Sequence, residues 1–238
     1  MPLIFSPISE ELIELPPQRL FPRHAFLMRQ IGDPPDIDRV MLDAVRKICT
    51  DYGFETKDAT SSTGGKDFLE RILGLIRGTG FTIAIFSHAT RATAMANLCL
   101  ELGFAAMCGK PLIVVKSREA AAPSDLTRTD WIEYTLGEEA EFEQKLRQAL
   151  DQVDEIASYQ EMLLNIALEA PEMDCAVALE RATKAFLLNG NQDVIEAVAT
   201  IEDRLRAAAD DSEFDDIKRL HREVATFVRQ GRLLKGAA

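Results

Sequence analysis

The sequence predicts an α/β fold: a doubly wound parallel sheet followed by an all-α C-terminal helical region. Before about residue 152, short apolar runs alternate with amphipathic helical patterns, which is typical of βαβ units. One run, residues 81–86, is apolar almost throughout, as expected for a strand that helices cover on both faces. After residue 153 no strand-like run remains, and apolar residues recur at helical spacing.

These patterns divide the chain into three parts: an irregular, proline-rich lead-in over 1–22, a sheet domain over 23–152 and a helical region over 153–238. Strands are expected at 24–28, 54–57, 81–86, 112–115 and 131–134. Helices are expected at 37–48, 68–76, 91–108 and 138–150, with residues 33–36 supplying a turn and a cap for the first of them. Four further helical stripes are expected at 159–166, 177–188, 194–205 and 214–227.

Composition and charge exclude several classes of partner. The chain has 27 Lys and Arg against 39 Asp and Glu, a formal net charge of −12. Neither nucleic acid nor a membrane is expected as a partner, because proteins that neutralise backbone phosphates are usually basic. No apolar run approaches the roughly 18 residues that cross a bilayer. The N-terminus lacks signal-peptide features, and the four cysteines lack metal-binding spacing, so we expect a cytoplasmic protein without a metal site.

The segment from Ser87 to Pro111 is the most informative part of the sequence. Ser87 directly follows the predicted strand 81–86, and open α/β sheets bind ligands outside the carboxyl ends of their strands. The next helix is apolar except for Thr93, Asn97 and Glu101, whose spacing places them in one narrow stripe. This stripe is either the solvent-facing edge of a buried helix or the wall of a pocket. In a pocket, a carboxylate could bind sugar hydroxyls or stabilise an oxocarbenium ion.

Residues 97–105, followed by Gly109, Lys110 and Pro111, resemble the N-V-x-x-E-L-G-x-A and G-K-P signature of TIR-like predicted nucleotide-binding domains and nucleoside 2-deoxyribosyltransferases. The resemblance covers roughly residues 23–135 and implies a flavodoxin-like sheet that binds a nucleotide or nucleoside. It also implies that Glu101 acts at the ribosyl carbon of an N-glycosidic bond. The chain departs from the family at Ile85, where an Asp is common, and at residues 28–30, which replace an aromatic-Pro-Phe motif.

Other candidate ligand contacts lie in the loops of the sheet domain. Arg29 follows the first strand and could meet a phosphate, although a surface arginine is the simpler interpretation. Gly64 and Gly65 could place backbone N–H groups near the ligand, with Asp67 adding a carboxylate. A plain loop in which Asp67 caps the next helix explains the same residues.

The resulting hypothesis is a TIR-like domain that binds a nucleotide such as NAD as its substrate, needs no cofactor and cleaves the N-glycosidic bond. Glu101 would be the catalytic carboxylate, while Ser87 and Asn97 would orient ribose or phosphate. A non-enzymatic TIR-type protein-interaction module and a nucleoside deoxyribosyltransferase are the alternatives. The amphipathic stripes of the helical region also predict a homo-oligomer, because each stripe needs a surface to cover it.

Overall fold

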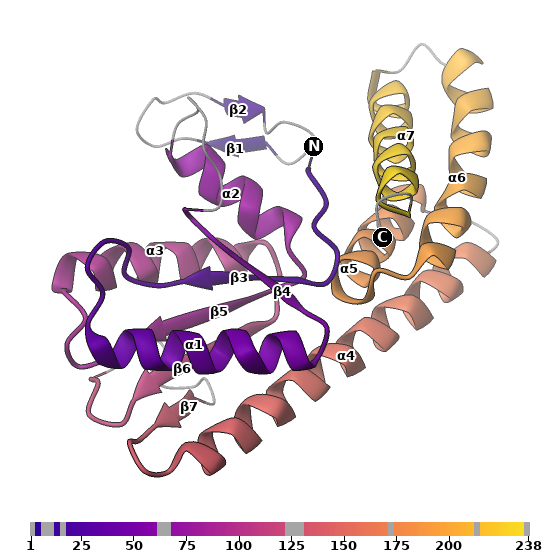
Figure 1. Cartoon of the computed structure of the whole chain (residues 1–238). Coiled ribbons are helices and arrows are strands. Elements are labelled where there is room, and N and C mark those ends of the chain that lie inside the picture. The colour runs from indigo at the N-terminus through magenta and orange to yellow at the C-terminus, as the bar shows by residue number, and fades with distance from the viewer. Residues whose placement is uncertain are drawn as a thin grey trace. The chain divides into compact units, whose positions relative to one another are not determined.

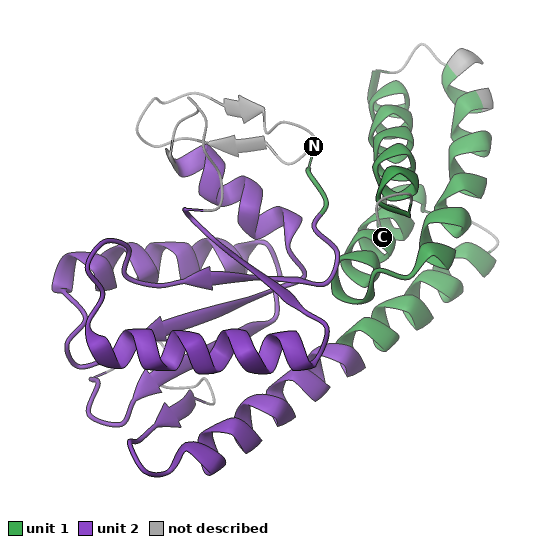
Figure 2. Cartoon of the chain, in the orientation of Figure 1, with its two compact units in different colours: residues 1–20, 156–238 green, residues 21–155 purple. Residues whose placement is uncertain are grey.

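The computed structural model of the chain (Figure 1) describes residues 3–5, 12–14, 18–60, 68–121, 131–170, 174–211 and 215–235. Figure 2 shows its two compact units: a sheet unit, Phe21–Glu155, and a helical unit, Met1–Leu20 with Ile156–Ala238. The boundary between them falls within one helix, α4 (Glu139–Glu169). Each unit contains its own cluster of buried apolar side chains.

The sheet unit is built on parallel strands. They are β3 (His24–Met28), β4 (Glu55–Asp58), β5 (Phe81–Phe86), β6 (Leu112–Ser117) and β7 (Trp131–Tyr134). Their spatial order is β4-β3-β5-β6-β7, and every neighbouring pair is parallel. This order confirms the predicted flavodoxin-like, doubly wound sheet. The chain reverses its direction of winding between β3 and β5, so the carboxyl ends of these two strands form the switch point where such sheets bind ligands.

Helices on both faces of the sheet explain why its central strands β3 and β5 are so apolar. The helices before α4 are α1 (Asp36–Asp51), α2 (Phe68–Gly78) and α3 (Ala92–Met107). In Figure 1, α1 lies on one face of the sheet and α3 on the other. On the α3 side, Phe86 packs in a buried cluster with Leu98 and Leu102. Ile85 points to the opposite face and is buried as well, because successive strand residues alternate between two covered faces.

The helical unit packs around two aromatic rings. Its helices are the second half of α4, α5 (Cys175–Asn189), α6 (Gln192–Asp211) and α7 (Asp215–Lys235). The rings of Phe186 and Phe227 meet edge to face, with centroids 5.9 Å apart. α6 and α7 approach closely at Gly231, where an added Cβ would lie 2.3 Å from Cδ1 of Ile195. These helices confirm the predicted all-α C-terminal region.

Residues at its two ends determine where α5 begins and where it stops. The Asp174 carboxylate accepts hydrogen bonds from the N–H groups of Ala176 and Val177 at 2.9 and 3.2 Å. It thereby satisfies two of the free donors at the helix start. At the other end Gly190 has a φ of +71°, a left-handed conformation that glycine adopts without strain.

α1, by contrast, begins without a side-chain cap. Its N-cap residue is Pro35, and no side chain makes a capping hydrogen bond there. The expectation that residues 33–36 cap this helix is therefore wrong. Asp36 and Asp38 lie inside the first turn instead, where the helix dipole favours negative charge. Pro35 has no backbone N–H to offer to either carboxylate.

α4 is much longer than the sequence predicted. A helix ending near residue 150 and a separate one over 159–166 were expected, yet α4 continues unbroken to Glu169. No glycine or proline lies between residues 139 and 169 to end the helix. Leu150, Val153 and Ala157 are buried and continue its apolar face across the expected break.

The lead-in contains regular structure where an irregular segment was expected. β1 (Leu3–Phe5) and β2 (Leu12–Glu14) pair as a short antiparallel sheet. Every proline of the first 17 residues falls outside these strands: Pro2, Pro7, Pro16 and Pro17. A proline would remove a ladder hydrogen bond, so this spacing leaves both strands free to pair.

Candidate functional site

Glu101 lies on α3 beside the face that packs against the sheet. Its neighbours Leu98, Leu102 and Ala105 belong to the core, and Glu101 itself is half-buried. Within the described residues its carboxylate has neither a hydrogen bond nor an ion pair. Burial raises the pKa of Glu101 to about 7, because the ionised form loses hydration without gaining a partner. The sequence alone left the direction of this shift open, and burial decides it.

We expect Glu101→Gln to raise the melting temperature at neutral and alkaline pH but not in acid. The carboxyl has its ordinary pKa of 4.5 when exposed and about 7 when folded, so the folded state holds the proton more tightly. Wild-type stability therefore falls as pH rises from 4.5 to about 7, by up to about 3 kcal/mol, whereas Gln stays neutral throughout.

Melting curves of both proteins across this pH range check the prediction. The melting temperature of Glu101→Gln relative to wild type should increase between pH 4.5 and about 7, and the difference should stay constant at higher pH. A difference that does not change with pH would mean that the Glu101 carboxyl titrates normally in the folded protein.

The polar residues predicted to act with Glu101 do not share its environment. Thr93 and Asn97 are exposed on α3. Ser87 is buried at the end of β5, and its hydroxyl accepts a hydrogen bond from the N–H of Ala89 at 3.2 Å. In the described part of the chain, no hydrogen bond joins Glu101 to Ser87 or Asn97. Glu101 lies nine residues after the start of α3, about 14 Å along the helix axis.

Arg29 follows β3 as predicted, but its charge is already compensated. Its Nη2 and Nε donate to Oδ2 of Asp58 at 2.7 and 3.1 Å. Burial alone would raise the pKa of Asp58, yet hydrogen bonds from Thr60 and Arg29 hold this pKa below its usual value. A phosphate would have to compete with Asp58 for Arg29.

Two further cations at the carboxyl end of the sheet are also paired. Nζ of Lys116 lies 2.8 Å from a carboxylate oxygen of Glu133, and Arg118 forms an ion pair with Glu138. Arg29, Lys116 and Arg118 therefore each have an acidic partner within the chain. Gly64, Gly65 and Asp67 lie outside the described residues, so their roles stay predictions.

A hydrogen-bond network that the sequence did not reveal surrounds the switch point. It holds the β5–α3 turn, residues 87–91. Asp38 of α1 accepts a hydrogen bond from the Thr90 hydroxyl at 3.1 Å, and the Gln30 side chain accepts one from the N–H of Arg91 at 2.9 Å. Asp38 and Gln30 are only 4% and 3% exposed. Oδ1 of Asp38 is buried and has no hydrogen-bond partner among the described residues.

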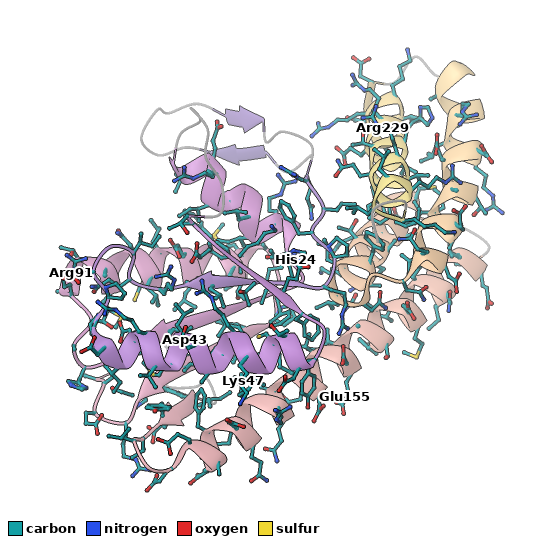
Figure 3. All side chains as sticks on the ribbon, in the orientation of Figure 1. His24, Asp43, Lys47, Arg91, Glu155 and Arg229 are labelled. Carbon is teal, nitrogen blue, oxygen red and sulfur yellow. The ribbon has the colours of Figure 1, made fainter. Side chains whose placement is uncertain are left out.

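Figure 3 shows where this network lies: Arg91 is at the end of the sheet unit where the strands finish, and His24, at the start of β3, is at the other end. Gln30 could have been suspected, because polar residues just after a strand often face the ligand. Asp38 gave no such signal, since an acidic residue in a first helical turn is common for reasons of helix stability alone.

His88 contacts Ser117 and not its neighbour Ser87. Its Nδ1 lies 3.3 Å from Oγ of Ser117 and 3.7 Å from a carboxylate oxygen of Glu119. Ser117 is fully buried at the end of β6, so a substrate has no access to its hydroxyl. This cluster therefore does not support a serine-hydrolase mechanism.

Among the described residues, no cluster of three or more His, Cys, Asp and Glu side chains could hold a metal ion. None of the helices that the structure describes combines the length and apolar character of a membrane span. Comparison with models of protein families gave no match, and comparison with curated protein sequences gave none either. The case for a function consequently depends on the residues themselves.

Proposed function

We propose that the sheet unit binds a nucleotide such as NAD and hydrolyses its N-glycosidic bond, with Glu101 as the catalytic carboxylate. The observation that carries this proposal is a half-buried carboxyl without a partner in the described residues, on the helix that follows the switch-point strand β5. A carboxylate in such a place interacts strongly with developing positive charge, because little water screens it.

The reaction needs only one acidic group and water. The bond between C1′ of the ribose and the nicotinamide nitrogen breaks, and its electron pair leaves with nicotinamide as a neutral base. Ionised Glu101 stabilises the positive charge on the ribosyl group. Water then adds to C1′ and releases a proton, which a carboxylate with a pKa near 7 accepts readily. The products are nicotinamide, ADP-ribose and a proton.

The position of Glu101 favours a long ligand. It lies about 14 Å along α3 from the helix start at the switch point, although side chains on a helix tilt back toward its N-terminus. A dinucleotide is long enough to occupy the switch point and still reach Glu101. A single nucleoside would contact only one of these two places.

Product analysis with the full-length protein tests the proposal. NAD is incubated with the protein, and in parallel a deoxynucleoside is incubated with a different free base. Nicotinamide and ADP-ribose as products support hydrolysis, whereas exchange of the bases supports the transferase. Heat-denatured protein is the control, and unchanged substrates in both reactions would refute both enzymatic functions.

One observation favours a non-enzymatic interaction function as a second candidate, with the contact surface on the helical unit and not on the TIR-like sheet unit. Tyr159, Met162 and Ile166 are 54%, 48% and 59% exposed along one side of α4. Apolar side chains gathered on a surface often mark a protein interface. In this second candidate they contact another copy of the chain, in keeping with the homo-oligomer predicted above. This second candidate is supported if both substrates stay unchanged and light scattering shows a dimer. A monomer by light scattering would refute it.

A further inference from the structure

We propose that Asp38 binds a ligand hydroxyl at the switch point, specifically a ribose hydroxyl of a nucleotide. The nucleotide class of the ligand rests on the proposed function. Neither Glu101 nor bond cleavage enters this inference.

The first observation is the unsatisfied oxygen of Asp38. Its Oδ1 is buried and lacks a hydrogen-bond donor among the described residues, while the side chain is only 4% exposed. A carboxylate oxygen is an acceptor only, so the missing partner must carry an N–H or O–H group. A buried acceptor without a partner costs folding free energy, and native proteins rarely retain one without a reason.

The second observation is that the chain itself has removed the local donor. Asp38 is the third residue of α1, the position from which an acidic side chain often accepts a hydrogen bond from the N-cap N–H. Here the N-cap is Pro35, which has no N–H. Pro35 therefore cannot supply the donor, and no other N–H of the helix start donates to Oδ1 in the described residues.

The third observation is the direction of the side chain. Oδ2 of Asp38 accepts from the Thr90 hydroxyl, which itself accepts from the N–H of Ser87 at 2.8 Å. The carboxylate thus reaches from α1 to the turn that follows β5. α3 begins beside it, with Arg91 as an N-cap that makes no side-chain cap. The N–H groups there favour an anion, so a hydroxyl at Asp38 and a phosphate at α3 fit a ribose phosphate.

Ligand entry requires a small movement of the β5–α3 turn, because Oδ1 is covered. The hydrogen bonds of Thr90 to Asp38 and of Arg91 to Gln30 join this turn to α1 and to the residues after β3. When the turn moves, Asp38 loses the hydrogen bond from Thr90. A ribose hydroxyl that donates to the carboxylate replaces this bond. The ligand thus supplies the donor that the protein lacks.

The test compares AMP with 2′,3′-dideoxy-AMP, which lacks both ribose hydroxyls, by titration calorimetry on the full-length protein. Wild type should bind AMP about 10- to 100-fold more tightly than the dideoxy analogue, the usual range for a hydrogen bond to a charged group. Asp38→Ala should abolish this discrimination, and Asp38→Asn should reduce it about tenfold, because a neutral acceptor binds a hydroxyl less strongly.

Thr90→Val is the matched control. It has nearly the same shape. It removes the hydrogen bonds of the Thr90 hydroxyl to Asp38 and from the Ser87 N–H, but it leaves Oδ1 untouched. If Asp38 contacts the ligand, Thr90→Val keeps the discrimination between AMP and its analogue. If Asp38 only positions the turn, Thr90→Val and Asp38→Ala lose affinity alike, and the inference is wrong. Melting curves confirm that each variant is folded.

The outcome also separates this inference from the proposed reaction. Discrimination that depends on Asp38, without release of nicotinamide from NAD, supports the inference and refutes the hydrolysis. Hydrolysis of NAD without discrimination between AMP and its analogue supports the proposed reaction and refutes the role of Asp38. Absence of nucleotide binding in wild type overturns both.

Discussion

Replacing Glu101 by Gln should slow the release of nicotinamide from NAD about 10²- to 10³-fold, the usual loss when one group that stabilises transition-state charge is removed. Gln has almost the same shape and fits the same helix, but it carries no charge and accepts no proton. Affinity for NAD should change much less than the rate, because the charge at the ribosyl group develops only as the bond breaks.

Glu155→Gln is the matched control for this experiment, because Glu155 is an exposed glutamate on another helix, α4 (labelled in Figure 3). Nicotinamide is quantified by chromatography at saturating NAD. Wild type and Glu155→Gln should release it at equal rates. Equal rates in wild type and Glu101→Gln would remove Glu101 from the mechanism, whatever the effect of the substitution on melting.

Replacing Phe186 by Ala should lower the free energy of unfolding of the helical unit by about 3–5 kcal/mol. Phe186 is fully buried, and its ring packs edge to face against Phe227. The substitution removes both the buried apolar area and the aromatic contact and leaves a cavity that the helices fill only in part. Since domains are typically stable by about 5–15 kcal/mol, this is a large share of the total.

Urea unfolding followed by far-ultraviolet circular dichroism measures this effect. Leu233→Ala on α7 is the control, because Leu233 is 70% exposed and its loss should change the stability by no more than about 0.5 kcal/mol. The fluorescence of Trp131, the single tryptophan, reports on β7 and so follows the sheet unit separately. A midpoint for Phe186→Ala equal to that of Leu233→Ala would show that the Phe186–Phe227 pair does not hold the helical core.

The sheet was predictable because its signals are local. The limits of β5 and β7 agree with the sequence prediction, since each strand is a short run bounded by turn residues. The length of α4 was not predictable from its amphipathic pattern. The buried residues Leu150, Val153 and Ala157 form one continuous stripe. The exposed apolar residues Tyr159, Met162 and Ile166 lie on another side of α4 and so looked like the face of a separate helix.

The site was less predictable because its contacts are distant in the sequence. Thr90 and Asp38 are 52 residues apart, and Arg91 and Gln30 are 61 apart. Nothing in the local pattern of α1 marks Asp38 as different from other acids in a first turn. The direction of the Glu101 pKa shift likewise depends on tertiary packing, because burial and hydrogen bonding change a carboxyl pKa in opposite directions.

The internal pairing of Arg29, Lys116 and Arg118 with acidic residues has a consequence for the speed of ligand capture. These cations present little unpaired positive charge to an incoming anion, while the whole chain carries a net charge of −12. A nucleotide therefore approaches against a weakly repulsive field, which dissolved salt screens over a distance of about 8–10 Å at physiological ionic strength. The association rate of the nucleotide should consequently rise with ionic strength. At a positively charged binding site, by contrast, the association rate of an anion falls as salt is added.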